Sequence, residues 1–183
     1  VYLDQWGPMD QLKHGLIEKN NDGKSSYYNT SGINIFQNFD RVRYVKSGKF
    51  IEFYKNKKQG VADSNGNIII SPIFDSCYIY EKYNLILARL DKKYGLFDIH
   101  GSCLTSFNYD DMSIFGEYSI VIVKKDNRFG AINMQGKEII PCEFEELKID
   151  RDNICYGVQQ DSITGKFGVF DHTHDSGPHE EGR

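Results

Sequence analysis

Short apolar runs alternate with polar turns along this chain, and their lengths suit strands rather than helices. Val121–Val123 leads through the polar pair 126–127 into Phe129–Ile132, which predicts a β-hairpin with a polar tip. Asp63–Gly66 and Asp98–Gly101 predict tight turns, because Asp at the first position can bond the turn backbone and Gly at the last supplies a positive φ. The pattern predicts strands and turns throughout.

One block repeats along the chain: a basic residue, any residue, Gly and two apolar residues. Its central glycines, Gly60, Gly95 and Gly130, are 35 residues apart, while Gly168 follows after 38 residues and Gly15 precedes Gly60 by 45. The basic residues of the block are Lys13, Lys58, Lys93, Arg128 and Lys166. Three or four short strands in each copy leave no room for a helix. We therefore expect an all-β fold of about five tandem 35-residue repeats of short antiparallel strands.

Two further positions keep the same period. A second glycine follows six residues after the first, and an aromatic–acid pair follows nine residues later; the glycines are Gly66, Gly101 and Gly136, and the pairs are Phe39-Asp40, Phe74-Asp75, Tyr109-Asp110 and Phe144-Glu145. We expect the second glycines to have positive φ and the first glycines to lie in strands that a neighbour approaches closely. We expect the four aromatic rings to be buried, with Phe97, Ile132 and Phe170 packed beside them.

Two architectures fit such an array: a small propeller whose blades close a ring, and an open curved β-array. Closure requires residues 14–36 to supply the strands that the last copy lacks after Gly168–Asp171. A radial layout leaves fewer exposed strand edges, which favours the propeller.

The best copy, Arg128–Pro141, resembles the WG-type (KWG) repeat common in bacterial proteins. The resemblance covers about residues 12–171 and rests on spacing, because other residues replace the tryptophan that names the family: His14, Gln59, Tyr94, Phe129 and Phe167. It implies an interaction or structural module without catalytic residues. We expect one repeat array over residues 1–171, with structural roles for Gly60, Gly95, Gly130, Gly168, Asp75 and Asp110, and a polar His- and acid-rich tail at 172–183.

Composition narrows the class of partner. The 183 residues include 22 Lys and Arg against 26 Asp and Glu, a net charge of −4, which argues against a nucleic-acid partner. No apolar stretch approaches the ~20 residues of a membrane span, so we expect no membrane insertion. The four cysteines lack zinc-site spacing, so we expect buried free thiols, no metal and no cofactor. The chain begins at Val1, which leaves open both a cytoplasmic bacterial protein and an exported one without its signal peptide; we expect a monomer.

The recurring cations are the first candidate binding residues. With Lys13, the candidates Lys58, Lys93, Arg128 and Lys166 would form a basic rim, and Glu18, Asp63, Asp98 and Asp171 would form an acidic rim five residues later. Such charged rims suit a protein partner with a complementary face. The alternative is that both rims are solvated hairpin ends.

Tyrosines are the second candidate. Tyr83 and Tyr118 share one repeat position and could stack on a sugar or anchor a peptide, or simply fill space between copies. Paired acids of the kind glycosidases use occur at 110–111 and 145–146, but they fall in the repeated structural slot. The tail histidines His172, His174 and His179 fit a solvated tail better than a metal site. We therefore expect a non-catalytic scaffold for protein–protein interaction; the alternative is glycan or cell-surface ligand binding by exposed tyrosines.

Overall fold

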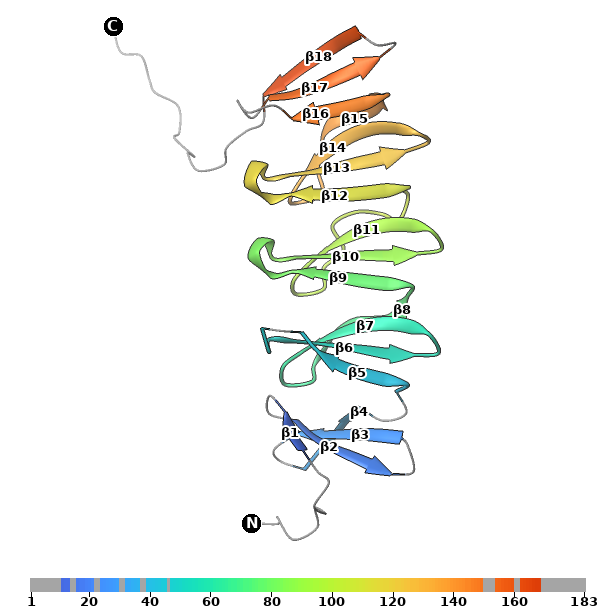
Figure 1. Cartoon of the computed structure of the whole chain (residues 1–183), viewed down its shortest axis with the longest axis vertical. Helices are drawn as coiled ribbons and strands as arrows, with labels where there is room; N and C mark the ends of the chain where they lie inside the picture. The colour runs from blue at the N-terminus through green and yellow to red at the C-terminus, as the bar shows by residue number, and fades with distance from the viewer. Residues whose placement is uncertain are drawn as a thin grey trace, which may run out of the picture. The chain divides into compact units, whose positions relative to one another are not determined.

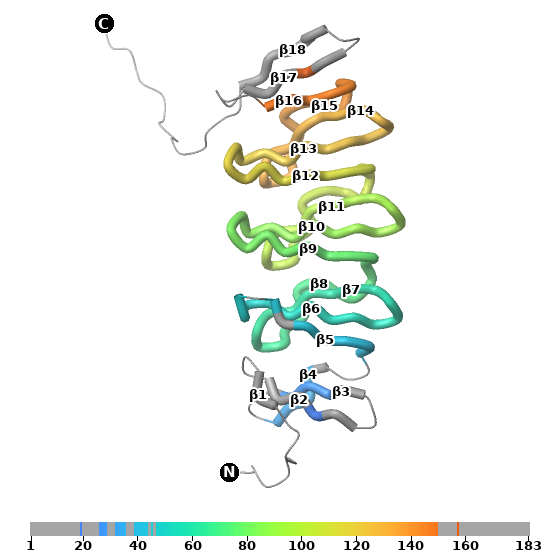
Figure 2. Tube along the Cα trace, viewed as in Figure 1, coloured from blue at the N-terminus to red at the C-terminus, as the bar shows by residue number. Residues whose placement is uncertain are grey.

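The computed structural model describes residues 11–13, 16–21, 24–29, 32–36, 39–45, 47–149, 154–159 and 162–168 (Figures 1 and 2). Apart from two short 3-10 turns, every regular element within those ranges is a β-strand. The all-β prediction is confirmed.

The strands form five small antiparallel sheets, each built from strands consecutive in the chain (Figure 1). The first sheet contains β1 (Gln11–Lys13), β2 (Leu16–Asn21), β3 (Lys24–Asn29) and β4 (Asn34–Phe36), and the second contains β5 (Arg41–Tyr44), β6 (Phe50–Lys55), β7 (Lys58–Asp63) and β8 (Ile68–Phe74). The third contains β9 (Ser76–Tyr80), β10 (Leu85–Leu90) and β11 (Lys93–Asp98). The fourth contains β12 (Asp111–Phe115), β13 (Ile120–Lys125), β14 (Arg128–Asn133) and β15 (Glu138–Phe144), and the fifth contains β16 (Glu146–Ile149), β17 (Ile154–Gln159) and β18 (Ser162–Gly168).

The described strands near the N-terminus pair with one another. β2 pairs with β1 and β3, and β3 pairs with β4, whereas β16, β17 and β18 make a separate three-stranded sheet. The described strands of residues 14–36 therefore build a sheet of their own and do not complete the last copy.

The internal contacts divide the chain into two units. The first comprises residues 1–79, 86–91 and 99–102, and the second comprises 80–85, 92–98 and 103–183. The division passes through the copy that contains Gly95.

The core of the first unit is centred on β6 and β7. Ile51, Phe53 and Ala62 are fully buried and pack with Tyr27 of β3. Because side chains alternate along a strand, Glu52 lies on the opposite face of β6, where it is buried and pairs with Arg43.

The second unit has a core between β14 and β15, on the sheet face that corresponds to Val61 and Ile70 of the first unit and not to Ile51 and Ala62. Ala131, Ile140 and Phe144 are buried, and Leu147 and Ile149 of β16 pack against them. Val61, Ile70 and Phe74 hold the same repeat positions in the first unit and are buried too, so this face of the sheet is covered in both copies.

The aromatic positions follow the predicted register with a difference in depth. Phe74 and Phe144 are buried, as are Phe97 and Ile132, whereas Phe39 and Tyr109 are half-buried. Tyr109 differs because its copy has no β-strand equivalent to β8 or β15; it pairs with Tyr94 through an isolated bridge. Phe170 lies outside the described residues.

The three central hairpins turn through two residues that both have positive φ, the geometry of a type I′ turn. The pairs are Asn56–Lys57 (52° and 63°), Asp91–Lys92 (49° and 68°) and Asp126–Asn127 (50° and 64°). The polar tip predicted at 126–127 is confirmed.

The two glycines of each central copy behave differently, as predicted. Gly66, Gly101 and Gly136 have φ of 89°, 94° and 81°. Gly130 lies in β14 where β15 bulges, and a Cβ there would stand 2.6 Å from the Ile140 carbonyl oxygen. At Gly95 the close neighbour is instead the Phe107 ring, at 2.8 Å, which takes the place of the missing strand.

Candidate functional site

The recurring cation and the recurring acid form an ion pair in each of the three central copies. The pairs are Lys58 Nζ to Asp75 Oδ1 at 2.6 Å, Lys93 Nζ to Asp110 Oδ1 at 2.5 Å, and Arg128 Nη1 to Glu145 Oε1 at 3.1 Å. Partners lie 17 residues apart, on either side of the second glycine. Three of the four cations predicted to bind a partner, Lys58, Lys93 and Arg128, therefore already have a counter-ion within their own copy.

The second carboxylate oxygen of the acid holds the next hairpin. Asp75 Oδ2 accepts a hydrogen bond from the backbone N–H of Asp91 at 2.9 Å, and Asp110 Oδ2 accepts one from that of Asp126 at 2.8 Å. These donors are the first residues of the type I′ turns. One carboxylate thus links the cation of its own copy to the turn of the following copy.

The electrostatics of these carboxylates follow from their donors. A hydrogen bond from the Lys58 ammonium is the main cause that lowers the pKa of Asp75, and the Asp91 N–H contributes. Lys93 lowers the pKa of Asp110 in the same way. Both acids are held in the charged form that the contacts require.

Asp63, one acid of the predicted acidic rim, has a turn-forming role. Asp63 Oδ1 accepts hydrogen bonds from the backbone N–H groups of Asn65 at 2.9 Å and Asn67 at 2.8 Å. Asn133 makes the equivalent two bonds in the fourth sheet with its neutral amide oxygen. The turn therefore needs a side-chain acceptor but no charge. The side chains of Glu18 and Asp171 lie outside the described residues, as do those of Lys13 and Lys166.

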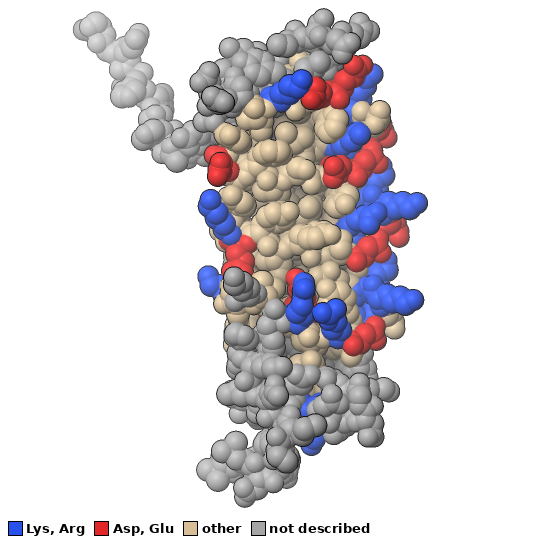
Figure 3. All heavy atoms as spheres, viewed as in Figure 1, with Lys and Arg blue, Asp and Glu red and all other residues tan. Residues whose placement is uncertain are grey.

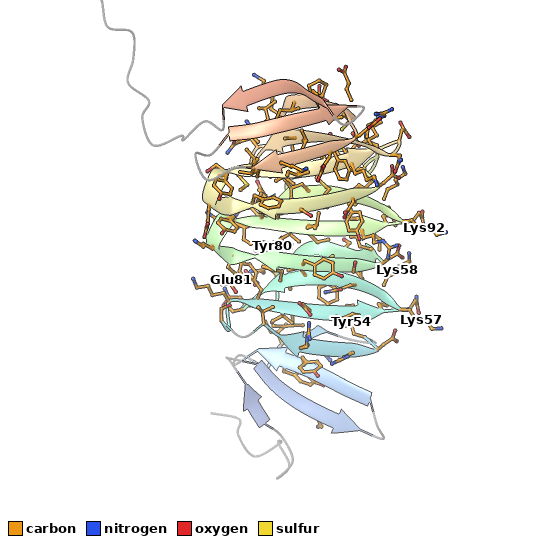
Figure 4. The ribbon with its side chains drawn as sticks, turned by 45° about the horizontal axis from the view of Figure 1, so that its top comes forward. Tyr54, Lys57, Lys58, Tyr80, Glu81 and Lys92 are labelled. Carbon is orange, nitrogen blue, oxygen red and sulfur yellow. The ribbon has the colours of Figure 1, made fainter. Side chains whose placement is uncertain are left out.

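Lysines at the hairpin tips are differently placed. Lys57 and Lys92 are exposed, each at the second position of its turn, and neither has an ion-pair partner within the described part of the chain (Figure 4). Figure 3 shows lysine and arginine side chains beside acids at the edges of the described part, with mostly uncharged side chains between them. Within the described residues no carboxylate forms an ion pair with either tip lysine, although Asp91 directly precedes Lys92 and Asp40 Oδ2 accepts a hydrogen bond from the Lys57 backbone N–H at 3.3 Å.

The candidate tyrosines lie on the two 3-10 turns, η1 (Glu81–Tyr83) and η2 (Gly116–Tyr118). Both are half-buried, and the Tyr83 ring lies where a side chain at position 116 would stand. Tyr83 therefore fills space between neighbouring copies. Tyr83 and Tyr118 line one hollow of about 210 Å³, together with Ile114, Phe115 and Glu117.

The cysteines only partly fit the prediction. Cys77 is a buried free thiol, and burial raises its pKa to about 12. Cys142 is half-buried, and Cys103 is exposed, so the expectation of burial is wrong for Cys103. Cys103 holds the repeat position of Ile68 and Glu138, which are also exposed, so this position faces outward in all three central copies. The Cys155 side chain and the tail histidines lie outside the described residues.

The described residues contain no group of three or more His, Cys, Asp or Glu side chains placed to hold a metal ion. They also contain no helix of the length and hydropathy needed to cross a membrane.

Sequence reasoning missed a polar contact at the family's tryptophan position. Gln59 is buried, its Nε2 donates to the Cys77 carbonyl oxygen at 3.2 Å, and its Oε1 accepts from the Cys77 N–H at 3.1 Å. The equivalent residues, Tyr94 and Phe129, are aromatic. The sequence did offer one sign of this contact: Gln59 is an amide at a repeat position that aromatic residues occupy in the other central copies.

The chain is similar in sequence to one known family of repeats. The family model described as "WG containing repeat" matches three tandem segments, 60–94, 94–129 and 129–162. The three segments start at Gly60, one residue before Gly95 and one residue before Gly130, the first glycines of the central copies. No curated protein sequence matches the chain.

The solved structures similar to this chain include two that share little sequence identity with it. A crystal structure of the eukaryotic initiation factor is 16% identical with a TM-score of 0.41, covering 72% of this chain and 40% of that one. Kluyveromyces lactis Hsv2 with complete loop 6CD is 8% identical with a TM-score of 0.42, covering 87% and 62%. This chain spans less than two thirds of either structure. The family model matches more than half of the sequence, and its segments follow the repeating contacts described above: the chain belongs to the WG-repeat family.

Proposed function

We propose that this WG-repeat scaffold is non-catalytic and binds a protein partner through its cationic hairpin tips. The observation that carries the proposal is that Lys57 and Lys92 occupy positive-φ positions, at 63° and 68°, without an ion-pair partner in the described part of the chain. Functional residues are often kept at positions that local stability disfavours.

The turn itself gives no reason for lysine. The second position of a type I′ turn favours Gly or Asn, and Asn127 occupies it in the next hairpin. A side chain such as lysine in the left-handed region costs roughly 1–2 kcal/mol. An acidic partner would offset that cost by pairing with the ammonium groups.

The recurring cations have a secondary part in this proposal. Lys58, Lys93 and Arg128 are neutralised by their carboxylates, so they add little net charge, although their side chains remain partly exposed. The recurring acids and cations of the described copies act in ion pairs and turns, which supports a scaffold rather than an enzyme.

The test compares the double variant Lys57→Gly/Lys92→Gly with Lys82→Gln/Lys137→Gln, which removes the same charge from other exposed positions. Each protein is immobilised and exposed to host lysate at about 50 and 300 mM salt, because exposed charge pairs weaken with screening. We expect the tip variant to retain or gain thermal stability, because glycine suits the turn, and to lose salt-sensitive partners that the control keeps. Retention of the same partners with unchanged salt dependence would refute the proposal.

Glycan binding is the second candidate, favoured by the hollow at η2. Phe115 is 39% exposed there, next to the exposed carboxylate of Glu117 and the half-buried Tyr118. Aromatic faces with a nearby hydrogen-bonding group suit sugar rings. Binding on a glycan array that Phe115→Ala and Tyr118→Ala abolish, and that the tip variant leaves intact, would favour this candidate over the first.

A further inference from the structure

A hollow of about 390 Å³ lies in the first unit, at the end of the β6–β7 hairpin opposite its tip. Phe50 and Asp63 are paired neighbours at this end, six residues along each strand from the turn. At about 3.3 Å per residue, this end lies roughly 20 Å from Lys57. The hollow is therefore separate from the tip surface proposed above.

Apolar side chains form much of its lining. Phe50, Ile68, Ile69 and Ile99 all contribute, and Ile68 is 53% exposed. The volume falls within the range of about 300–1,000 Å³ that is typical of ligand pockets. A ligand that covers the exposed Ile68 side chain would bury apolar surface, which contributes favourably to the free energy of binding.

The lining includes one cation, Lys49, and one carboxylate, Asp63. The Asp63 carboxylate accepts three hydrogen bonds, two from backbone N–H groups and one from Asn67 Nδ2 at 2.7 Å, so the turn already uses it. Lys49 is exposed, and no carboxylate pairs with its ammonium group within the described residues. His100 and Asn67 complete the rim.

We infer that this hollow binds a peptide segment of a partner in which an aliphatic side chain stands next to a carboxylate. The aliphatic side chain would cover Ile68 and Ile69, and the carboxylate would pair with Lys49. The inference rests on the proposed protein-binding function, and it adds a second contact and the chemistry of the partner. Charge complementarity distinguishes this ligand from a neutral or cationic one of the same shape.

Three matched probes test the inference: N-acetyl-leucyl-aspartate amide and its asparagine and lysine counterparts. They are titrated into protein labelled with ¹³C at isoleucine δ1 methyls, which places reporters at Ile68, Ile69 and Ile99 in the wall. We expect saturable shifts at these methyls, with the aspartate probe binding about two- to fivefold more tightly than the asparagine probe, as suits one exposed ion pair. The lysine probe should bind more weakly than both.

Variants separate this site from the tips. Lys49→Gln should bring the aspartate probe to the affinity of the asparagine probe, and Ile68→Ser, at an exposed position, should weaken all three. Lys57→Gly should leave the titrations unchanged, so failure of the tip proposal and failure of this one are distinguishable. Equal affinity for the aspartate and lysine probes, or shifts at Ile139 of the second unit as large as those in the wall, would overturn the inference.

Discussion

Replacing Gly130 with alanine should destabilise the protein more than the same change at Gly95. At Gly130 the added Cβ would stand 2.6 Å from the Ile140 carbonyl oxygen and 2.8 Å from the Cys142 nitrogen, both of them backbone atoms of β15. At Gly95 it would stand 2.8–2.9 Å from the Phe107 ring, which is half-buried. A side chain can rotate away from a clash, whereas a paired strand must shift as a whole.

The magnitude follows from two opposing effects. Overpacking typically costs about 1–3 kcal/mol, and Gly130 belongs at the upper end because backbone atoms are involved. Alanine also lowers the entropy of the unfolded chain, which returns about 0.4–1 kcal/mol. We therefore expect a net loss of about 2 kcal/mol for Gly130→Ala and about 1 kcal/mol or less for Gly95→Ala.

The assay is urea unfolding followed by circular dichroism, supported by thermal melts. In a protein of this size 1 kcal/mol corresponds to about 2–4 °C, so Gly130→Ala should lower Tm by about 4–8 °C. Ser113→Ala, at an exposed position of β12 in the same sheet, is the control and should leave Tm nearly unchanged. An equal loss for the two glycine variants, or a more stable Gly130→Ala, would refute the packing of β15 over Gly130.

Three other outcomes are expected. Because the pKa of Asp110 is lowered in the folded protein, its contacts stabilise the fold above the unfolded Asp pKa of about 4, and this stabilisation is lost as pH falls through the folded pKa. Asp110→Asn should therefore flatten the decline of the urea midpoint between about pH 5 and 2.5, and an unchanged slope would contradict the contacts of Asp110. Gly116→Ala and Tyr83→Ala should each lower the free energy of unfolding, and the double variant should lose less than the sum of the two single losses, with a coupling energy of about 0.5–3 kcal/mol. Strictly additive losses would show that the two residues do not touch. Gln59→Leu removes the side-chain partners of the buried Cys77 N–H and C=O, so it should lower the free energy of unfolding by about 1–3 kcal/mol and speed hydrogen exchange of the Cys77 amide. An unchanged exchange rate would count against the contact.

The sequence alone was sufficient for the repeat and its turns, because backbone geometry imposes residue types there. A turn that needs positive φ selects glycine, which made Gly66, Gly101 and Gly136 visible at a fixed period. Glycine is also required where a neighbouring strand comes too close to leave room for a side chain, as β15 does at Gly130.

The candidate site was harder to predict because it depends on contacts between residues far apart in the sequence, both within a copy and between copies. Lys58 and Asp75 are 17 residues apart, and nothing in a list of charges shows that a turn brings them together. The bond from Asp75 to the Asp91 N–H further requires the packing of two copies. The missing strand at residues 103–108 was also unforeseen, since Phe107 replaces strand contacts with a ring.

The shared carboxylate has a consequence for how such chains vary in length. Asp75 and Asp110 each require a cation 17 residues before and a turn N–H 16 residues after, so every contact is specified by offsets along the chain. Duplicating or deleting one whole 35-residue period preserves those offsets, whereas a shorter insertion between the cation and the turn breaks them. Genes for chains of this kind can therefore lengthen or shorten by complete units, and an engineer could splice additional units at the position after Asp75 without redesigning the joints.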